Sequence, residues 1–147
     1  SHLLLKDTFD NFSFIEGEIT TFNKFTISGF LQEDFFDEKP EETYSRWNKT
    51  RDFCFQIIRG KRTPLGFKIV LALPEDQVPY FLTAHGLTGY RPEEIRGLYL
   101  NFHYDGHHLQ CITGTSLNTF TMDKSIEREW DQEVKNILKS RSIEGDY

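Results

Sequence analysis

The sequence predicts one α+β domain over residues 1–147, with a mostly antiparallel sheet and helices packed on one of its faces. Two pairs of strand-like segments are each joined by a tight-turn signal, which is typical of antiparallel hairpins. Other segments carry apolar residues at helical spacing. Fourteen Phe, six Tyr and two Trp against one Met indicate a core built on aromatic rings. A chain of 147 residues is long enough for one such core.

The chain opens with the pattern of a helix end, which is followed by a predicted hairpin. His2–Phe9 is amphipathic, but Ser1 is the only residue before it that could cap a helix. We therefore expect the natural chain to begin upstream. Phe12–Thr21 and Lys24–Leu31 are rich in β-branched and aromatic residues, and Phe22-Asn23 between them predicts a tight turn.

An acidic loop and a helix are predicted next. Glu33–Glu42 holds six acids, one Lys and Pro40, a composition typical of a solvated loop. Tyr44–Arg59 has apolar residues at helical spacing, and Gly60 is placed to cap a helix at its C-terminal end. The alternating Phe and Ile residues within Arg51–Ile58 would also suit a strand, so the sequence leaves that segment open.

The second half predicts a strand, a short helix, a hairpin, a further strand and an amphipathic helix. These segments are Gly66–Leu73, Pro74–His85, Gly97–Thr113, Thr119–Met122 and the stretch that follows Asp123 or Ser125 as N-cap. Gly86 is expected to end the short helix, since glycine adopts the left-handed backbone of a cap. Asp105-Gly106 is the pair that a two-residue type I′ turn favours.

That two-residue turn would determine the register of the second hairpin. It would place Leu100 opposite Cys111 on the core face and His103 opposite His108 on the other face. Two histidines directly across a ladder could share a zinc ion, which prefers imidazole nitrogens. The local sequence offers no third ligand, so a polar, solvent-facing sheet surface is the alternative interpretation.

The net charge of −6 is unevenly distributed. Arg46–Lys68 contains seven basic residues and one acid, so its net charge is +6. Within it, Arg59, Lys61 and Arg62 lie in a predicted turn between a helix and a strand, where backbone N–H groups and cationic side chains could hold phosphate oxygens. The same cations could instead stabilise the helix C-terminus or pair with the acidic loop Glu33–Glu42.

Composition narrows the cellular setting. No apolar run approaches the roughly 18 residues needed to cross a bilayer, so a membrane is not an expected partner. Cys54 and Cys111 lie far apart, with no Cys-x-x-Cys pair, which fits a reducing cytoplasm. No motif indicates a cofactor.

Three segments resemble a family of uncharacterised proteins from anaerobic Firmicutes: Ile19–Gly29, Phe53–Phe67 and Tyr104–Leu117. This resemblance runs over nearly the whole chain and implies no known activity. It also implies that this domain lacks a native N-terminal strand, which agrees with the uncapped opening at Ser1. A looser one concerns architecture, because the predicted order of strand, helix and three strands is similar to one repeat of the sliding DNA clamps. That resemblance implies a clamp-like fold with basic helices facing DNA. The helix Pro74–His85 carries no Lys or Arg, which departs from the clamp pattern.

Together these patterns favour a small binding or adaptor domain over an enzyme. The expected partner is nucleic acid or another anion, contacted by Arg59, Lys61 and Arg62. Two alternatives stay open: a metal-assisted enzyme centred on His103 and His108, and a protein-interaction module that uses exposed aromatic side chains.

Overall fold

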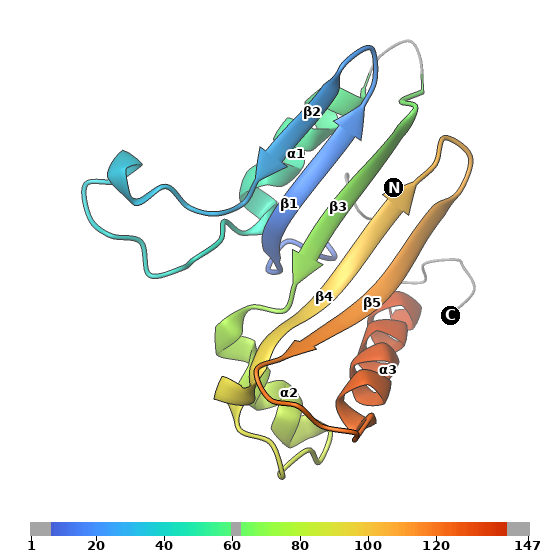
Figure 1. Ribbon diagram of the computed structural model, residues 1–147. Helices are drawn as coiled ribbons and strands as arrows, with labels where there is room; N and C mark the ends of the chain where they lie inside the picture. The colour runs from blue at the N-terminus through green and yellow to red at the C-terminus, as the bar shows by residue number, and fades with distance from the viewer. Residues whose placement is uncertain (1–6, 60–62, 141–147) are drawn as a thin grey trace. The chain divides into compact units, whose positions relative to one another are not determined.

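The computed structural model describes residues 7–59 and 63–140, which form a five-stranded antiparallel sheet and three α-helices (Figure 1). The α+β prediction is therefore confirmed. The strands are β1 (Ser13–Thr20), β2 (Lys24–Ser28), β3 (Gly66–Ala72), β4 (Ile95–Tyr104) and β5 (Leu109–Leu117), in the sheet order β2-β1-β3-β4-β5. The helices are α1 (Trp47–Ile58), α2 (Val78–Ala84) and α3 (Ser125–Ser140), with short 3₁₀ turns η1 (Glu33–Phe35), η2 (Glu75–Gln77) and η3 (Pro92–Glu94).

The described residues divide into two compact units. Unit 1 contains the residues up to Ala72 together with Asn101–Ile112, and unit 2 contains Leu73–Leu100 and the residues from Thr113 onward. Strands β4 and β5 contribute to both units. Each unit has its own buried aromatic residues, so the prediction of an aromatic core is confirmed: Phe9, Phe14 and Trp47 are buried in unit 1, and Phe81 and Trp130 in unit 2.

In unit 1 the predicted first hairpin is formed by β1 and β2. Its register pairs Glu18 with Thr26, and the three residues between the strands are closed by a hydrogen bond from the Thr21 N–H to the Asn23 carbonyl. The other edge of β1 pairs antiparallel with β3. The strand predicted at Gly66–Leu73 is therefore confirmed in the centre of the sheet.

Helix α1 resolves the ambiguity at Arg51–Ile58 in favour of a helix. Trp47 and Cys54 are fully buried on its inner face, and the Trp47 ring lies 5.5 Å from the ring of Phe14 on β1. The helix begins at Trp47 rather than at the predicted Tyr44, because Tyr44 is engaged in a bridge with Phe30 that keeps the chain extended. Gly60, the predicted cap, lies outside the described residues.

In unit 2 the predicted helix Pro74–His85 is a 3₁₀ turn, η2, followed by α2. Gly86 ends it with a backbone φ of +68°, as predicted. Helix α3 is also confirmed, and the Asp123 carboxylate accepts the Ser125 N–H at 3.0 Å just before it. Trp130 joins α3 to the strands, because its indole N–H donates to the Tyr99 carbonyl at 3.0 Å.

Two predictions for the second half of the sequence were wrong. Strand β4 ends at Tyr104 and β5 begins at Leu109, so four residues separate them instead of two. The Asp105 carboxylate causes this longer turn by accepting the N–H groups of His107 and His108 at 2.8 and 2.7 Å. Thr119–Met122 is not a strand, because β5 already extends to Leu117 and the chain then turns toward α3.

The remaining differences lie near the ends of elements. Cys111 is half-buried rather than a core residue, since it sits on the edge strand β5. Asp7–Phe9 forms turns instead of a helix, and the earlier part of the predicted segment His2–Phe9 lies outside the described residues. The clamp-like order of one strand, one helix and three strands is therefore incomplete, because its last predicted strand, Thr119–Met122, does not form.

Candidate anion-binding site

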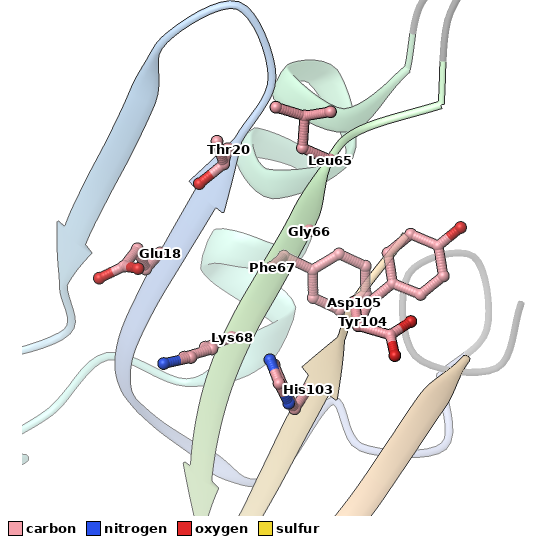
Figure 2. Close-up of a pocket in the computed structure, with 9 residues that line it drawn as sticks. All are labelled: Glu18, Thr20, Leu65, Gly66, Phe67, Lys68, His103, Tyr104 and Asp105. Carbon is pink, nitrogen blue, oxygen red and sulfur yellow. The ribbon is translucent and has the colours of Figure 1, made fainter. Parts of the chain in front are cut away.

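A pocket of about 250 Å³ opens on the polar face of the sheet in unit 1 (Figure 2). It is lined from three strands and from the turn that follows β4. The residues that give it its chemistry are Glu18, Thr20, Gly66, Lys68, His103 and Asp105. All of them belong to unit 1, so the site is complete within that unit.

Strand pairing explains why these residues meet. Alternation along β3 turns Phe67 and Ile69 into the core and leaves Gly66 and Lys68 on the other face. The antiparallel register then places Thr20 of β1 opposite Gly66 and Glu18 opposite Lys68. Figure 2 shows Glu18, Lys68 and His103 coming from β1, β3 and β4 on this face.

Gly66 contributes to the pocket by lacking a side chain. A Cβ built at this position would lie 2.7 Å from the Tyr104 carbonyl oxygen, which belongs to the backbone and cannot move aside easily. Glycine therefore allows β3 and the end of β4 to approach each other closely beside the pocket.

The two carboxylates at the pocket are already engaged. Glu18 forms an ion pair with Lys24 across β1 and β2, with 3.3 Å between the carboxylate oxygen and Nζ. Asp105 accepts hydrogen bonds from the backbone N–H groups of His108 and His107, which lower the pKa of its carboxyl. Their negative charge is thus partly satisfied by these partners.

Lys68 and His103 are exposed and form no ion pair with any described residue of the chain. Together with the Thr20 hydroxyl they offer an ammonium, an imidazole and an O–H donor around one hollow. Such donors suit the oxygens of a phosphate or carboxylate group. Lys68 is also the last cation of the basic segment Arg46–Lys68, so one end of that segment lines the pocket.

The predicted anion-binding turn is only partly within the described residues. Arg59 is exposed directly after α1, where its backbone N–H donates to the Phe55 carbonyl at 2.8 Å. Lys61 and Arg62 lie outside the described residues. The sequence did not identify Thr20 and Lys68 as site residues. The one local indication was the glycine at position 66, which is typical of a close approach between two strands.

The predicted histidine pair does not face across the ladder. His103 lies on β4, but His108 precedes β5 and belongs to the turn that Asp105 organises. Within residues 7–59 and 63–140, no group of three or more His, Cys, Asp or Glu side chains could hold a metal ion. A metal site at His103 and His108 stays a prediction, and it would need ligands from elsewhere.

A second cluster of titratable groups lies in unit 2, where His85 at the end of α2 sits between two glutamates of α3. Its Nδ1 lies 2.8 Å from a Glu129 carboxylate oxygen and its Nε2 lies 2.6 Å from one of Glu133. Only the protonated imidazolium can donate from both nitrogens. Burial alone would lower the pKa of His85, but the hydrogen bonds to Glu133 and Glu129 outweigh it and raise the pKa.

This arrangement predicts a stability that depends on pH. Because the pKa of His85 is higher in the folded chain, its contribution is complete below the unfolded pKa of about 6.5 and is lost as pH rises through the folded value. We expect the free energy of unfolding to fall as pH rises above about 6.5 and through the higher folded pKa, measured by urea denaturation at a series of pH values. In Glu129→Gln/Glu133→Gln this fall should be much smaller. Identical pH profiles for the variant and the parent chain would contradict the assignment.

Comparison with known proteins adds one result to this geometry. The model of a protein family described as a family of unknown function, DUF5721, matches residues 2–146. The chain belongs to DUF5721. The predicted membership of an uncharacterised family is therefore confirmed. No curated protein and no solved structure matches this DUF5721 chain. Over the described ranges, none of its helices combines the length and the apolar character that crossing a bilayer requires.

Proposed function

We propose that this chain is a non-enzymatic binding domain of the cytoplasm that contacts an anionic partner, with nucleic acid as the leading candidate. The observation that carries the proposal is the pocket on unit 1, which is lined by Thr20, Lys68 and His103 together with two carboxylates that already have partners. Cys54 and Cys111 lie far apart in the sequence, with no Cys-x-x-Cys pair, which supports a reducing compartment.

Charge distribution supports the same proposal. The chain as a whole carries −6, so a general attraction to polyanions is not expected. The positive charge is concentrated between Arg46 and Lys68, and the described end of that segment lines the pocket. We therefore expect an anion to contact this segment, at Lys68 in the pocket and at Arg59, Lys61 and Arg62 in the predicted turn.

The proposal predicts that Lys68→Ala weakens nucleic-acid binding at least about tenfold, since a charged hydrogen bond to phosphate contributes roughly 1.5–3 kcal/mol. Fluorescence anisotropy of labelled single- and double-stranded DNA, repeated at several salt concentrations, measures this. Affinity should fall steeply with salt, and the triple variant of Arg59, Lys61 and Arg62 to Ala should remove binding.

The matched control is Lys124→Ala. Lys124 is also exposed, but it pairs with Glu127 beside α3 in unit 2, away from the basic segment in the sequence. Its removal should leave the affinity unchanged. Equal loss of binding in Lys68→Ala and Lys124→Ala would show that net charge alone is responsible, and it would count against the pocket.

A further inference from the structure

The acidic residues Glu33–Glu42 belong to a longer loop, Leu31–Thr43, which we call the acidic loop from here on. Hydrogen bonds hold this loop in place at its base. The Leu31 N–H donates to the Thr43 carbonyl and the Ser45 N–H to the Gly29 carbonyl, each at 2.9 Å. Between them Phe30 bridges Tyr44, with their rings 5.9 Å apart. The chain enters and leaves the loop side by side, so the loop projects from unit 1 (Figure 1).

The tip of this loop exposes aromatic surface among negative charges. The Phe35 side chain is 84% exposed and meets Phe36 edge to face at 5.4 Å. Glu33–Glu42 carries a net charge of −5, with Asp34 before the two rings and Asp37 after them. Exposed rings bordered by charges are typical of a protein contact surface.

Helix α1 presents the complementary chemistry on its outer side. Lys49, Phe53, Gln56 and Arg59 follow one another at helical spacing and all are exposed, and we call them the basic stripe. The exposed acid Asp52 lies on the same side of the helix, so this surface carries two cations and one acid. The ring of Phe53 is 67% exposed, and Lys49 lies one helical turn before it on α1. Neither cation forms an ion pair with a described residue.

We propose that two copies of the chain associate by placing the acidic loop of each copy against the basic stripe of the other. Phe35 would meet Phe53, while Asp34 and Asp37 would lie near Lys49 and Arg59. Within one chain both surfaces stay exposed, so their complementarity is unused there. A two-fold axis would form the same contact twice, which is the usual geometry of a homodimer.

Sedimentation velocity over a range of protein concentrations, without nucleic acid, tests this association. The loop variant Asp34→Lys/Asp37→Lys and the stripe variant Lys49→Glu/Arg59→Glu should each dimerise at least about tenfold more weakly, because like charges then face each other. An equimolar mixture of the two variants should dimerise again. In that mixed pair the positive loop meets the negative stripe, and the other contact is unchanged.

A parent chain that stays monomeric at all concentrations would overturn the proposal, and so would a dimer that neither variant weakens. Failure of the mixture to restore the dimer would also overturn it. Phe35→Ser removes an exposed ring without changing the charge. It tests the same contact independently of charge and should weaken dimerisation. Lys68→Ala, which alters the pocket but neither of these surfaces, should leave the dimer intact.

Discussion

Trp130→Ala is expected to reduce the free energy of unfolding by about 3–5 kcal/mol, the range for truncating a buried Trp. The indole is fully buried in unit 2 and packs edge to face on Phe81, with ring centres 5.6 Å apart. It also donates to the Tyr99 carbonyl. Truncation therefore leaves a cavity and an unpaired carbonyl. Urea denaturation followed by circular dichroism measures the effect without relying on Trp fluorescence.

Trp130→Phe separates packing from the hydrogen bond. It keeps much of the aromatic volume and loses the indole N–H, so its own cost includes about 1 kcal/mol for the lost hydrogen bond. The loss in Trp130→Ala should be clearly larger than in Trp130→Phe. A loss below about 1 kcal/mol for Trp130→Ala would mean that this side chain does not hold α3 against β4 and α2.

Gly29→Ala is expected to destabilise unit 1 by about 3 kcal/mol or more. A Cβ at position 29 would lie 1.7 Å from the Phe14 carbonyl oxygen, and both atoms are attached to backbone. The backbone is also fixed on both sides, because the Gly29 N–H donates to Ile15 and its carbonyl accepts from Ser45. The new methyl group fits only if the backbone segments around Phe14 and Gly29 move apart. Thermal and urea denaturation measure the loss.

Gly89→Ala is the matched control for this substitution. Nothing lies within 4 Å of a Cβ built at Gly89, so the same chemical change should alter the free energy of unfolding by no more than about 0.5 kcal/mol. Similar effects at Gly29 and Gly89 would contradict the close approach of Gly29 to Phe14. Because Gly29 closes the base of the acidic loop, its variant should also weaken the proposed dimer.

The parts of the fold that the sequence predicts well are those with local signals. The first hairpin, the buried strand β3, the Gly86 cap and helix α3 each depend on residues that are close in sequence. The second hairpin was predicted with the wrong turn, because the Asp105 side chain competes for the backbone N–H groups of His107 and His108. The two extra residues in the turn change which side chains face each other across the ladder.

The candidate site was harder to predict, because it depends on pairing between segments distant in sequence. Lys68 was recognised as one of several cations, but its position beside Thr20 and His103 follows from the register of β1, β3 and β4. The His85 cluster was missed for the same reason. Glu129 and Glu133 are one helical turn apart on α3, yet nothing local indicates that a histidine from α2 lies between them.

The most direct test of the anion-binding proposal is a map of which backbone amides respond to a nucleic acid. Titration of ¹⁵N-labelled chain with a short single-stranded DNA, followed by ¹H–¹⁵N correlation spectra, provides it. We expect the largest shifts at Thr20, Gly66, Lys68 and His103, and these shifts should be absent in Lys68→Ala. Saturating shifts confined to α3, or no shifts at low salt, would contradict the proposal that this pocket binds an anion.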